Sequence, residues 1–413
     1  MRIKGVFYLL ATCLITVIYS CIDEDISPCP PNGVQLQYDY VLNMQYGNEF
    51  GRQVKDLKTF IFDEAGVLQD TLSPQIMGGE LSDNWTRNVE LAPGKYTLVS
   101  WANSVSCDQH FKITHNNDPL TPSSTGVVIG QTKLDDLRTF LRYNLDPADN
   151  DQATPQTDAF SDLFYGIAQN VEVKSMEMTT IHTSLIKDSK TIRVKVINLS
   201  AISKPAPVAR QFTFKLTGRN AHYKWNNKTG ESSYLVTYTP HTVAIDHDTL
   251  QADIKTLRLQ PYDAGNLFSA PVLLEGSCGS LKFCKELDVV DLILKSKIPS
   301  RDSRGQIQKE AVGDTIWVYP TLEYLDRQDI FEITFVCSGG EEPDPGPGPS
   351  PDPDPDPSPD PGPDPGPAPD PSPDPGPSPD PDPTPDPDPD LNPKVVITIY
   401  VNGWKIQDIV PDL

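Results

Sequence analysis

Proline alternates with small or acidic residues from residue 343 to residue 390, and this repeat decides where the chain can fold. Proline lacks a backbone N–H and fixes φ near −65°, so neither a helix nor an inner β-strand can form there. Each residue before a proline is also confined to extended geometry. We therefore predict a polyproline II spacer, which at ~3.1 Å per residue could span roughly 150 Å. About 320 residues precede it, enough for two domains with hydrophobic cores.

The leader and the changes in composition suggest six segments. We expect a signal peptide, a linker, two β-rich domains, the proline spacer and a terminal strand or hairpin. Their expected bounds are 1–20 for the signal peptide, 21–32 for the linker, 33–175 and 176–340 for the two domains, 341–393 for the spacer, and 394–413 for the terminal strand or hairpin.

The leader ends at a cysteine in a context that is typical of lipid attachment. Arg2 and Lys4 precede an apolar run from Val6 to Ile18, which is shorter than the ~20 residues of a membrane-spanning helix. Ile18-Tyr19-Ser20-Cys21 follows the lipobox pattern, so we predict cleavage before Cys21 and acylation of its thiol, for example by palmitate. The alternative is ordinary signal cleavage beside an unmodified cysteine. Acylation would make this chain a bacterial lipoprotein outside the inner membrane.

Charge and motifs exclude several classes of function. The net charge is −23, and the 13 aspartates of the repeat leave −10 on the rest of the chain, so nucleic acid should not bind. The sequence contains no nucleophile elbow, P-loop, dinucleotide fingerprint or H-E-x-x-H motif. We therefore expect no enzyme, no cofactor, no metal site and no small-molecule substrate.

The number of cysteines is odd once the leader and the lipidated residue are removed. Cys13 would leave with the leader and Cys21 would carry lipid, so five cysteines would remain. In an exported protein we expect Cys278 to pair with Cys284 and Cys29 with Cys107, which leaves Cys337 unpaired. Spacing does not determine connectivity, and all five thiols remaining reduced is the alternative.

Alternating apolar and polar residues predict an all-β protein, with β-sandwiches as the architecture. Two stretches instead show helical spacing and predict short amphipathic helices, at Leu134–Leu141 and Leu287–Leu294. The strands that we expect are 34–40, 54–62, 67–68, 95–101, 191–197, 211–216, 234–238, 257–259, 315–319 and 331–336.

The most strand-like run in the chain follows the spacer. Val395, Ile397, Ile399 and Val401 would share one face, and Asn402-Gly403 before Trp404 predicts a hairpin turn, with a bulge in one long strand as the alternative. A lone apolar strand is unstable in water, so this one must pair with a sheet. It could fold back onto its own chain or add to the sheet of another subunit. The sequence does not choose between the two.

Five groups of residues, taken in their order along the chain, resemble a known family. Cys21-Ile22-Asp23-Glu24-Asp25 is followed by Ser27-Pro28-Cys29-Pro30, then by the strand motif of residues 33–44. The run from Phe60 to Leu68 and the run from Leu91 to Asn103 complete the order. This order is similar to that of the fimbrial anchor lipoproteins of Bacteroidales, the base subunits of type V pili.

The resemblance implies two tandem transthyretin-like, Greek-key β-sandwiches, lipid attachment through Cys21, and a location on the surface of the outer membrane. The implied partner is a fimbrial stalk subunit, held by strand addition, and the anchor could also limit fibre length. Two alternatives are a fimbrial tip adhesin and a glycan-binding surface lipoprotein. The second would need exposed aromatic platforms, whereas the five tryptophans mostly lie in strand patterns and are interpreted as core: Trp85, Trp101, Trp225, Trp317 and Trp404.

Overall fold

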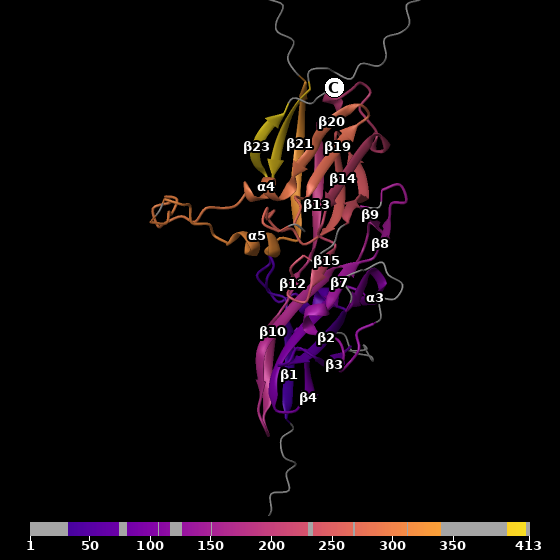
Figure 1. Cartoon of the computed structure of the whole chain (residues 1–413). Coiled ribbons are helices and arrows are strands. Elements are labelled where there is room, and N and C mark those ends of the chain that lie inside the picture. The colour runs from indigo at the N-terminus through magenta and orange to yellow at the C-terminus, as the bar shows by residue number, and fades with distance from the viewer. Residues whose placement is uncertain are drawn as a thin grey trace, which may run out of the picture.

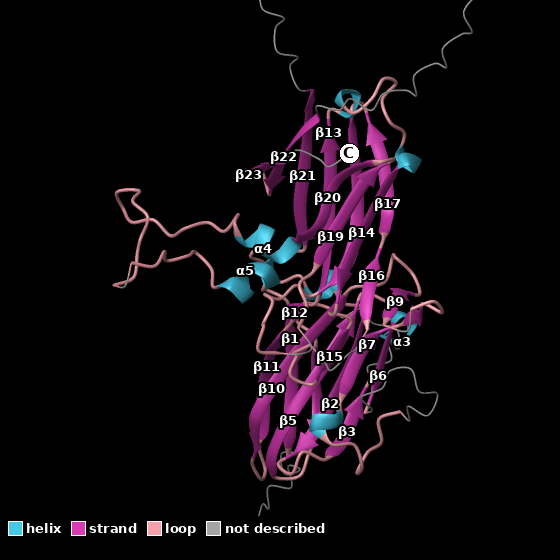
Figure 2. Ribbon diagram, turned by 45° about the horizontal axis from the view of Figure 1, so that its top comes forward, coloured by secondary structure: helices cyan, strands magenta, loops and turns pink. Residues whose placement is uncertain are grey.

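The protein is built almost entirely from β-strands, which form an elongated molecule with two β-rich parts along its length (Figures 1 and 2). This computed structural model describes residues 32–73, 81–105, 107–115, 126–149, 151–229, 234–266, 269–311, 313–339 and 395–409. The expected all-β class with a few short helices is confirmed. The transthyretin-like, Greek-key detail and the polyproline II spacer remain predictions, and the spacer lies outside the described residues.

Two sheets pack face to face in the first part. The smaller has the order β11-β1-β4, with β1 at Gly33–Asp39, β4 at Thr86–Glu90 and β11 at Met178–Ser184. The larger has the order β12-β10-β5-β2-β3, with β2 at Asp56–Asp63, β3 at Leu68–Leu72, β5 at Gly94–Asn103, β10 at Leu163–Val173 and β12 at Ile186–Lys187. Side chains from both sheets form one hydrophobic core.

Strand β1 illustrates how the sequence forms this layer. Val34, Leu36 and Tyr38 alternate with polar residues and are buried, as the period of two requires. β1 lies between two neighbours, antiparallel to β4 and parallel to β11. The Tyr38 hydroxyl forms hydrogen bonds of 2.8 Å with Thr59 and Ser100, which lie in the opposing sheet.

A third, small sheet packs near the other face of the larger sheet. Its order is β15-β7-β6, with β6 at Phe111–Thr114, β7 at Arg138–Leu141 and β15 at His222–Lys224. The helix predicted at Leu134–Leu141 is therefore wrong, because only a 3₁₀ turn at Leu134–Asp136 precedes the strand β7. All four residues of β7 are buried, including the polar residues Arg138 and Thr139. The strand therefore lacks the alternation of apolar and polar residues by which a half-buried strand is recognised in a sequence.

The second part contains two six-stranded sheets. One has the order β17-β18-β13-β21-β22-β23 and the other β20-β19-β14-β16-β9-β8. The first sheet consists of β13 (Ser189–Ile197), β17 (Pro240–Asp246), β18 (Thr249–Leu257), β21 (Ile330–Gly339), β22 (Val395–Val401) and β23 (Trp404–Ile409). The second consists of β8 (Tyr143–Leu145), β9 (Gln152–Pro155), β14 (Phe212–Gly218), β16 (Leu235–Tyr238), β19 (Leu273–Cys278) and β20 (Leu281–Asp288).

Short helices lie at the margins of these sheets. They are α2 at Phe50–Gln53, α3 at Cys107–His110, α4 at Val289–Leu294 and α5 at Thr321–Arg327, with 3₁₀ turns at Leu199–Ala201 and Ala209–Gln211. The predicted helix at Leu287–Leu294 is confirmed from residue 289 on. Asp288 caps it by accepting hydrogen bonds from the backbone N–H groups of Val290 and Asp291.

The chain passes between the two parts later than we expected. Strand β11 lies beyond the expected boundary near residue 175, yet it pairs with β1, and β12 still belongs to the first part. Strands also cross between the two parts in both directions. β9 precedes the boundary in the chain but pairs with β16 of the second part, and β15 follows the boundary but pairs with β7 of the first part. A boundary drawn from composition cannot detect such exchange.

Most of the expected strands are observed close to their predicted bounds. The exceptions are 257–259, which follows the end of β18, and 315–319, which forms only isolated bridges.

Candidate functional site

The C-terminal strands belong to the chain's own sheet. β22 runs antiparallel to β21, with the register running from Ile333–Val401 to Gly339–Val395, and β23 pairs with β22. Of the two arrangements that the sequence left open, the structure shows pairing within the chain. The 55 residues from 340 to 394 thus connect two positions that are partners in one ladder.

The predicted apolar face of the tail is confirmed where its side chains are described. Ile397, Ile399 and Val401 are fully buried and belong to the same hydrophobic cluster as Phe331 and Phe335 of β21. Val395 pairs with Gly339 in the ladder. Removing the tail would therefore uncover this core.

The predicted Asn-Gly hairpin turn is also confirmed. Asn402 and Gly403 both have positive φ, 47° and 83°, as a type I′ turn requires. The Asn402 backbone N–H donates to the Glu332 carbonyl at 2.9 Å, and its side-chain oxygen accepts from the Glu332 N–H at 3.1 Å. Its amide also donates to the Tyr324 hydroxyl at 3.3 Å, which ties the turn to α5.

An arm of residues 297–319 projects between α4 and α5, away from the sheets (Figures 1 and 2). Its stem pairs residues 298–300 with residues 316–318 through backbone hydrogen bonds of 2.7 and 3.1 Å. Beyond the stem the arm forks, with bridges between Arg301 and Ile307 and between Lys309 and Thr315.

Aromatic and cationic side chains meet where the arm leaves the body. The hydroxyls of Tyr46 and Tyr319 are 2.6 Å apart, and the Arg327 guanidinium lies 5.8 and 5.0 Å from the centroids of their rings. The Lys297 ammonium lies 4.9 Å from the Trp317 ring centroid. These contacts join the first part, the arm and α5 at one surface.

The interpretation of the tryptophans as core holds only in part. Trp101 is fully buried, and Trp85 and Trp225 are half-buried beside the two cores. Trp317 is 41% exposed and Trp404 is 61% exposed. Both lie in strand-like sequence, but the arm stands away from the sheets and Trp404 follows the turn at the start of β23.

A buried ionic network lies at the junction of the two parts. Arg258 makes a bidentate pair with Asp326, with Nε and Nη2 lying 2.7 and 2.6 Å from the carboxylate oxygens. The Lys190 ammonium, also buried, donates to the Asp326 carbonyl at 2.7 Å. Burial lowers the pKa of Lys190 to about 8. No local pattern predicts this network, because its members are far apart along the chain.

A second chain of ion pairs crosses the junction. Lys187 lies 3.0 Å from Asp162 and 3.2 Å from Asp329, and Lys255 lies 2.7 Å from Asp162. The Tyr40 hydroxyl, from the end of the first strand, donates to Asp329 at 3.0 Å. Burial opposes ionisation of Asp162, but the two lysines outweigh it and lower the pKa of that carboxyl to about 2.

Asp188 is the member of this region with the most unusual environment. Its side chain is fully buried, and Oδ1 accepts from the Asn227 amide at 2.9 Å. Burial raises the pKa of Asp188 to about 7, opposed by Arg258 at 3.9 Å, while Asp326 adds to the rise. Asp188 Oδ2 and Asn227 Oδ1 have no hydrogen-bond partner among the described residues.

We therefore expect Asp188 to make stability fall as pH rises. The folded state holds the Asp188 proton up to about pH 7, whereas the unfolded chain releases it near pH 4, so the folded state binds more protons between these values. Urea unfolding at about pH 4.5 and about pH 7.5 tests this. The free energy of unfolding of the natural chain, taken relative to that of an Asp188→Asn variant, should be lower at about pH 7.5 than at about pH 4.5. An equal difference at both pH values would contradict the expectation.

The predicted disulfide between Cys278 and Cys284 is wrong in this structure. Both are free, buried thiols, as is Cys337. The ladder between β19 and β20 places Cys284 opposite Gly276 and Cys278 opposite Leu281, so the two cysteines do not face each other. Cys21 and Cys29 lie outside the described residues, and Cys107 begins α3 without a described side chain. Lipidation and the Cys29–Cys107 pairing thus remain predictions.

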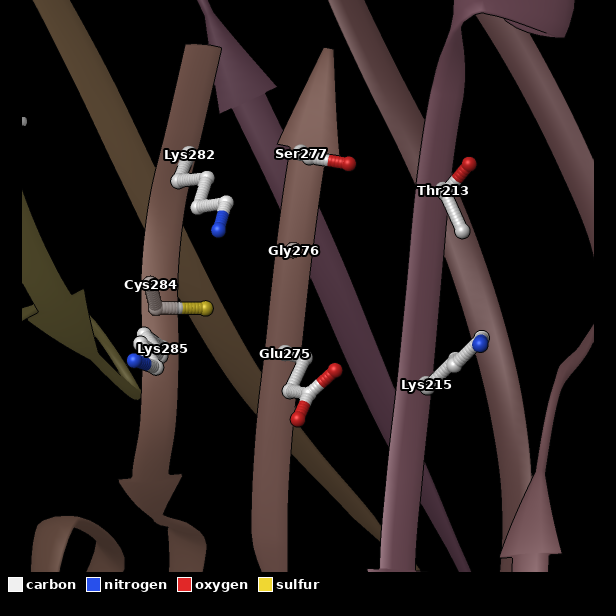
Figure 3. Close-up of a pocket in the computed structure, with 8 residues that line it drawn as sticks. All are labelled: Thr213, Lys215, Glu275, Gly276, Ser277, Lys282, Cys284 and Lys285. Carbon is white, nitrogen blue, oxygen red and sulfur yellow. The ribbon is translucent and has the colours of Figure 1, made fainter. Parts of the chain in front are cut away.

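A shallow hollow of about 280 Å³ lies over β14, β19 and β20 (Figure 3). Lys215, Lys282 and Lys285 surround it, and the Cys284 side chain points towards Gly276. Burial raises the pKa of the Cys284 thiol to about 12, so this sulfur stays protonated and is a poor nucleophile. In the part of the chain that the structure covers, no cluster of three metal-ligating side chains occurs. Among the same residues, no helix has the length and apolar character needed to cross a membrane.

The chain is thus an all-β protein of packed sheets whose C-terminal hairpin is part of its own sheet. The family model "Fimbrillin-A associated anchor proteins Mfa1 and Mfa2" matches residues 26–350, so the chain belongs to this family of fimbrial anchors. This bears out the resemblance seen in the sequence. Membership implies association with fimbriae at the cell surface. No match was found among curated proteins.

Solved structures support the fold. The fimbrial anchor protein Mfa2 from Porphyromonas gingivalis is 17% identical with a TM-score of 0.55, over 92% of this chain and 100% of that one. A candidate adhesin from Bacteroides ovatus is 19% identical with a TM-score of 0.56, over 77% and 90%. Another from Bacteroides thetaiotaomicron is 21% identical with a TM-score of 0.54, over 76% and 93%. At these identities the likeness concerns the fold alone.

Proposed function

We propose that this chain is a surface lipoprotein that holds a fimbria on the outer membrane through acylated Cys21. The observation that carries the proposal is the match to the anchor family over residues 26–350, which begins just after the lipobox. The arrangement of the ends supports it: β1 begins at one pole, and the positions where the spacer leaves and re-enters lie at the other (Figure 1). Lipid at the β1 pole would therefore leave the sheet that contains β22 and β23 directed away from the membrane.

The tail supports a refined form of strand addition. Its apolar face packs into the core of its own domain, so that face is not available to a partner. β23 is the last strand of its sheet, and its outer edge pairs with no strand in the described part of the chain. We propose that the stalk subunit adds its strand beside β23 and Trp404. β22 already occupies the edge of β21, so a strand from another subunit would find no place there. The chain would therefore stand at the end of a fibre and limit its length.

Lipid attachment is tested by replacing Cys21 with alanine. The variant should lose palmitate label, and both the protein and its fibres should move from the cells to the medium, because acyl chains supply the membrane affinity. Cys29→Ala is the matched control and should keep both label and location. Immunoblots of cells and medium give the readout. Label that persists in the Cys21 variant would refute lipidation at this position.

Loss of the whole gene separates an anchor from a tip adhesin. Without an anchor, fibres should still form but should accumulate in the medium, and immunogold against this chain should mark the fibre base in the natural strain. Gold at the far end of the fibre, with fibres retained by the deletion strain, would contradict the proposal.

A further inference from the structure

We propose that the stem of the projecting arm, together with Tyr46 and Trp404, is the surface that binds the protein subunit of the fibre. This inference rests on the proposed function and names the surface through which it acts. The arm surface consists of Tyr46, Ile298, Trp317, Val318, Leu322 and Trp404.

These residues come from four segments of the chain that hydrogen bonds bring together. Tyr46 contacts Tyr319 at 2.6 Å, and the Val318 N–H donates to the Ile298 carbonyl at 3.1 Å. Lys297 donates to the Thr321 hydroxyl at 3.1 Å, beside Leu322. The Asn402 amide donates to the Ser296 hydroxyl at 3.4 Å, which places the turn before Trp404 next to the root of the arm.

Three of these six side chains are more than half exposed. Tyr46, Trp404 and Ile298 are 63%, 61% and 55% exposed, and Val318 and Leu322 are each 48% exposed. A cluster of large apolar groups exposed on a protein surface marks an interaction site. Trp and Tyr are among the residues that most often dominate the binding energy of an interface. A thin ribbon without a core is also only marginally stable by itself. A partner that covers the stem would take its apolar side chains out of water and would also stabilise the ribbon.

The composition favours a protein as the occupant over a glycan. Three of the six residues, Ile298, Val318 and Leu322, are aliphatic, and aliphatic side chains offer a sugar no ring face to stack on. Trp317 and Val318 are adjacent in a strand-like stem, so they point to opposite sides of it. A partner that buries both must embrace the arm, as a groove or sheet edge of a protein subunit can. The arm carries four basic and three acidic residues, net +1, so we expect binding that depends weakly on salt.

Binding to fibres tests the inference directly. Fibres shed by a strain that lacks this chain are mixed with the full lipoprotein in detergent and pelleted, and the bound lipoprotein is measured. Trp317→Ser and Trp404→Ser should each weaken binding by about 30-fold, the effect of losing an interface hot spot. Val318→Ser removes a smaller side chain from the same stem and should weaken binding to fibres less than the tryptophan variants do. Val243→Ser is the matched control, because Val243 is 42% exposed on β17, at the opposite edge of the same sheet.

Each outcome decides between the two proposals. Weaker binding by the arm variants, with unchanged palmitate labelling and thermal unfolding, would support the arm surface. If the parent binds fibres and the arm variants bind equally well, the arm surface is refuted while the anchor function stands. If the parent does not bind and the deletion strain retains its fibres, the anchor function itself fails. Loss of binding to surface polysaccharide without loss of fibre binding would assign the surface to a glycan and overturn the inference.

Discussion

Replacing Arg258 with methionine should lower the free energy of unfolding by about 3–5 kcal/mol, because it leaves buried Asp326 without its counter-charge. The two side chains form a bidentate pair inside the junction, and the Asp188 carboxyl lies close by. Taking charges out of water is costly, and Arg258 is the group that bonds to the Asp326 carboxylate and offsets that cost, since Lys190 donates to the backbone carbonyl of Asp326 instead. Urea unfolding followed by circular dichroism measures the difference.

Arg193 supplies a control with the same geometry in a different environment. It makes a bidentate pair with Asp253 at 2.8 Å on both bonds, but its side chain is partly exposed. Arg193→Met should therefore cost at most about 1 kcal/mol. Adding Asp326→Leu to the Arg258 variant should restore most of the lost stability, because the unpaired charge is removed. Equal losses from the two arginine variants would show that burial is not what matters.

Replacing Ile399 with alanine should cost about 2–5 kcal/mol, since it opens a cavity in the core of the second part. Ile399 is fully buried on β22, although more than 50 residues separate it from β21 along the chain. Thermal unfolding of the full chain measures the loss. The effect should be independent of protein concentration, because the strand pairs within its own chain.

Gln407 is the matched control for this prediction. It lies directly opposite Ile399 in the β22–β23 ladder but is exposed. Gln407→Ala should change stability by no more than about 0.5 kcal/mol. A loss from Ile399→Ala that is small, or that grows on dilution, would mean that the tail pairs with another copy in solution.

The sequence predicted those features that depend on local pattern. The alternation of Val34, Leu36 and Tyr38 specified β1, and Asn402-Gly403 specified the tail hairpin, because both signals lie within a few residues. The buried face of the tail was predicted for the same reason. Which sheet would receive it was not, because a strand's pattern does not identify its partner.

Features that depend on distant parts of the chain could not be predicted. Residues 315–319 alternate as a buried strand does, yet they form an arm, because the pattern does not reveal whether another layer covers it. From the sequence alone, Lys190 and Arg258 would be taken for surface charges, because their partner Asp326 lies far from both along the chain. The expected Cys278–Cys284 bridge failed because a hairpin's register, and not the number of intervening residues, decides which side chains face each other.

The position of β1 has a mechanical consequence. Neighbours hold this strand along both sides, and it begins at one pole of the molecule (Figure 1), shortly after the stretch of sequence that would carry the lipid. A pull on the chain ahead of Gly33 acts lengthwise, so the hydrogen bonds on both flanks are loaded in shear and must break together. A fibre dragged by flowing liquid would thus meet its strongest resistance at the very strand through which tension enters the protein.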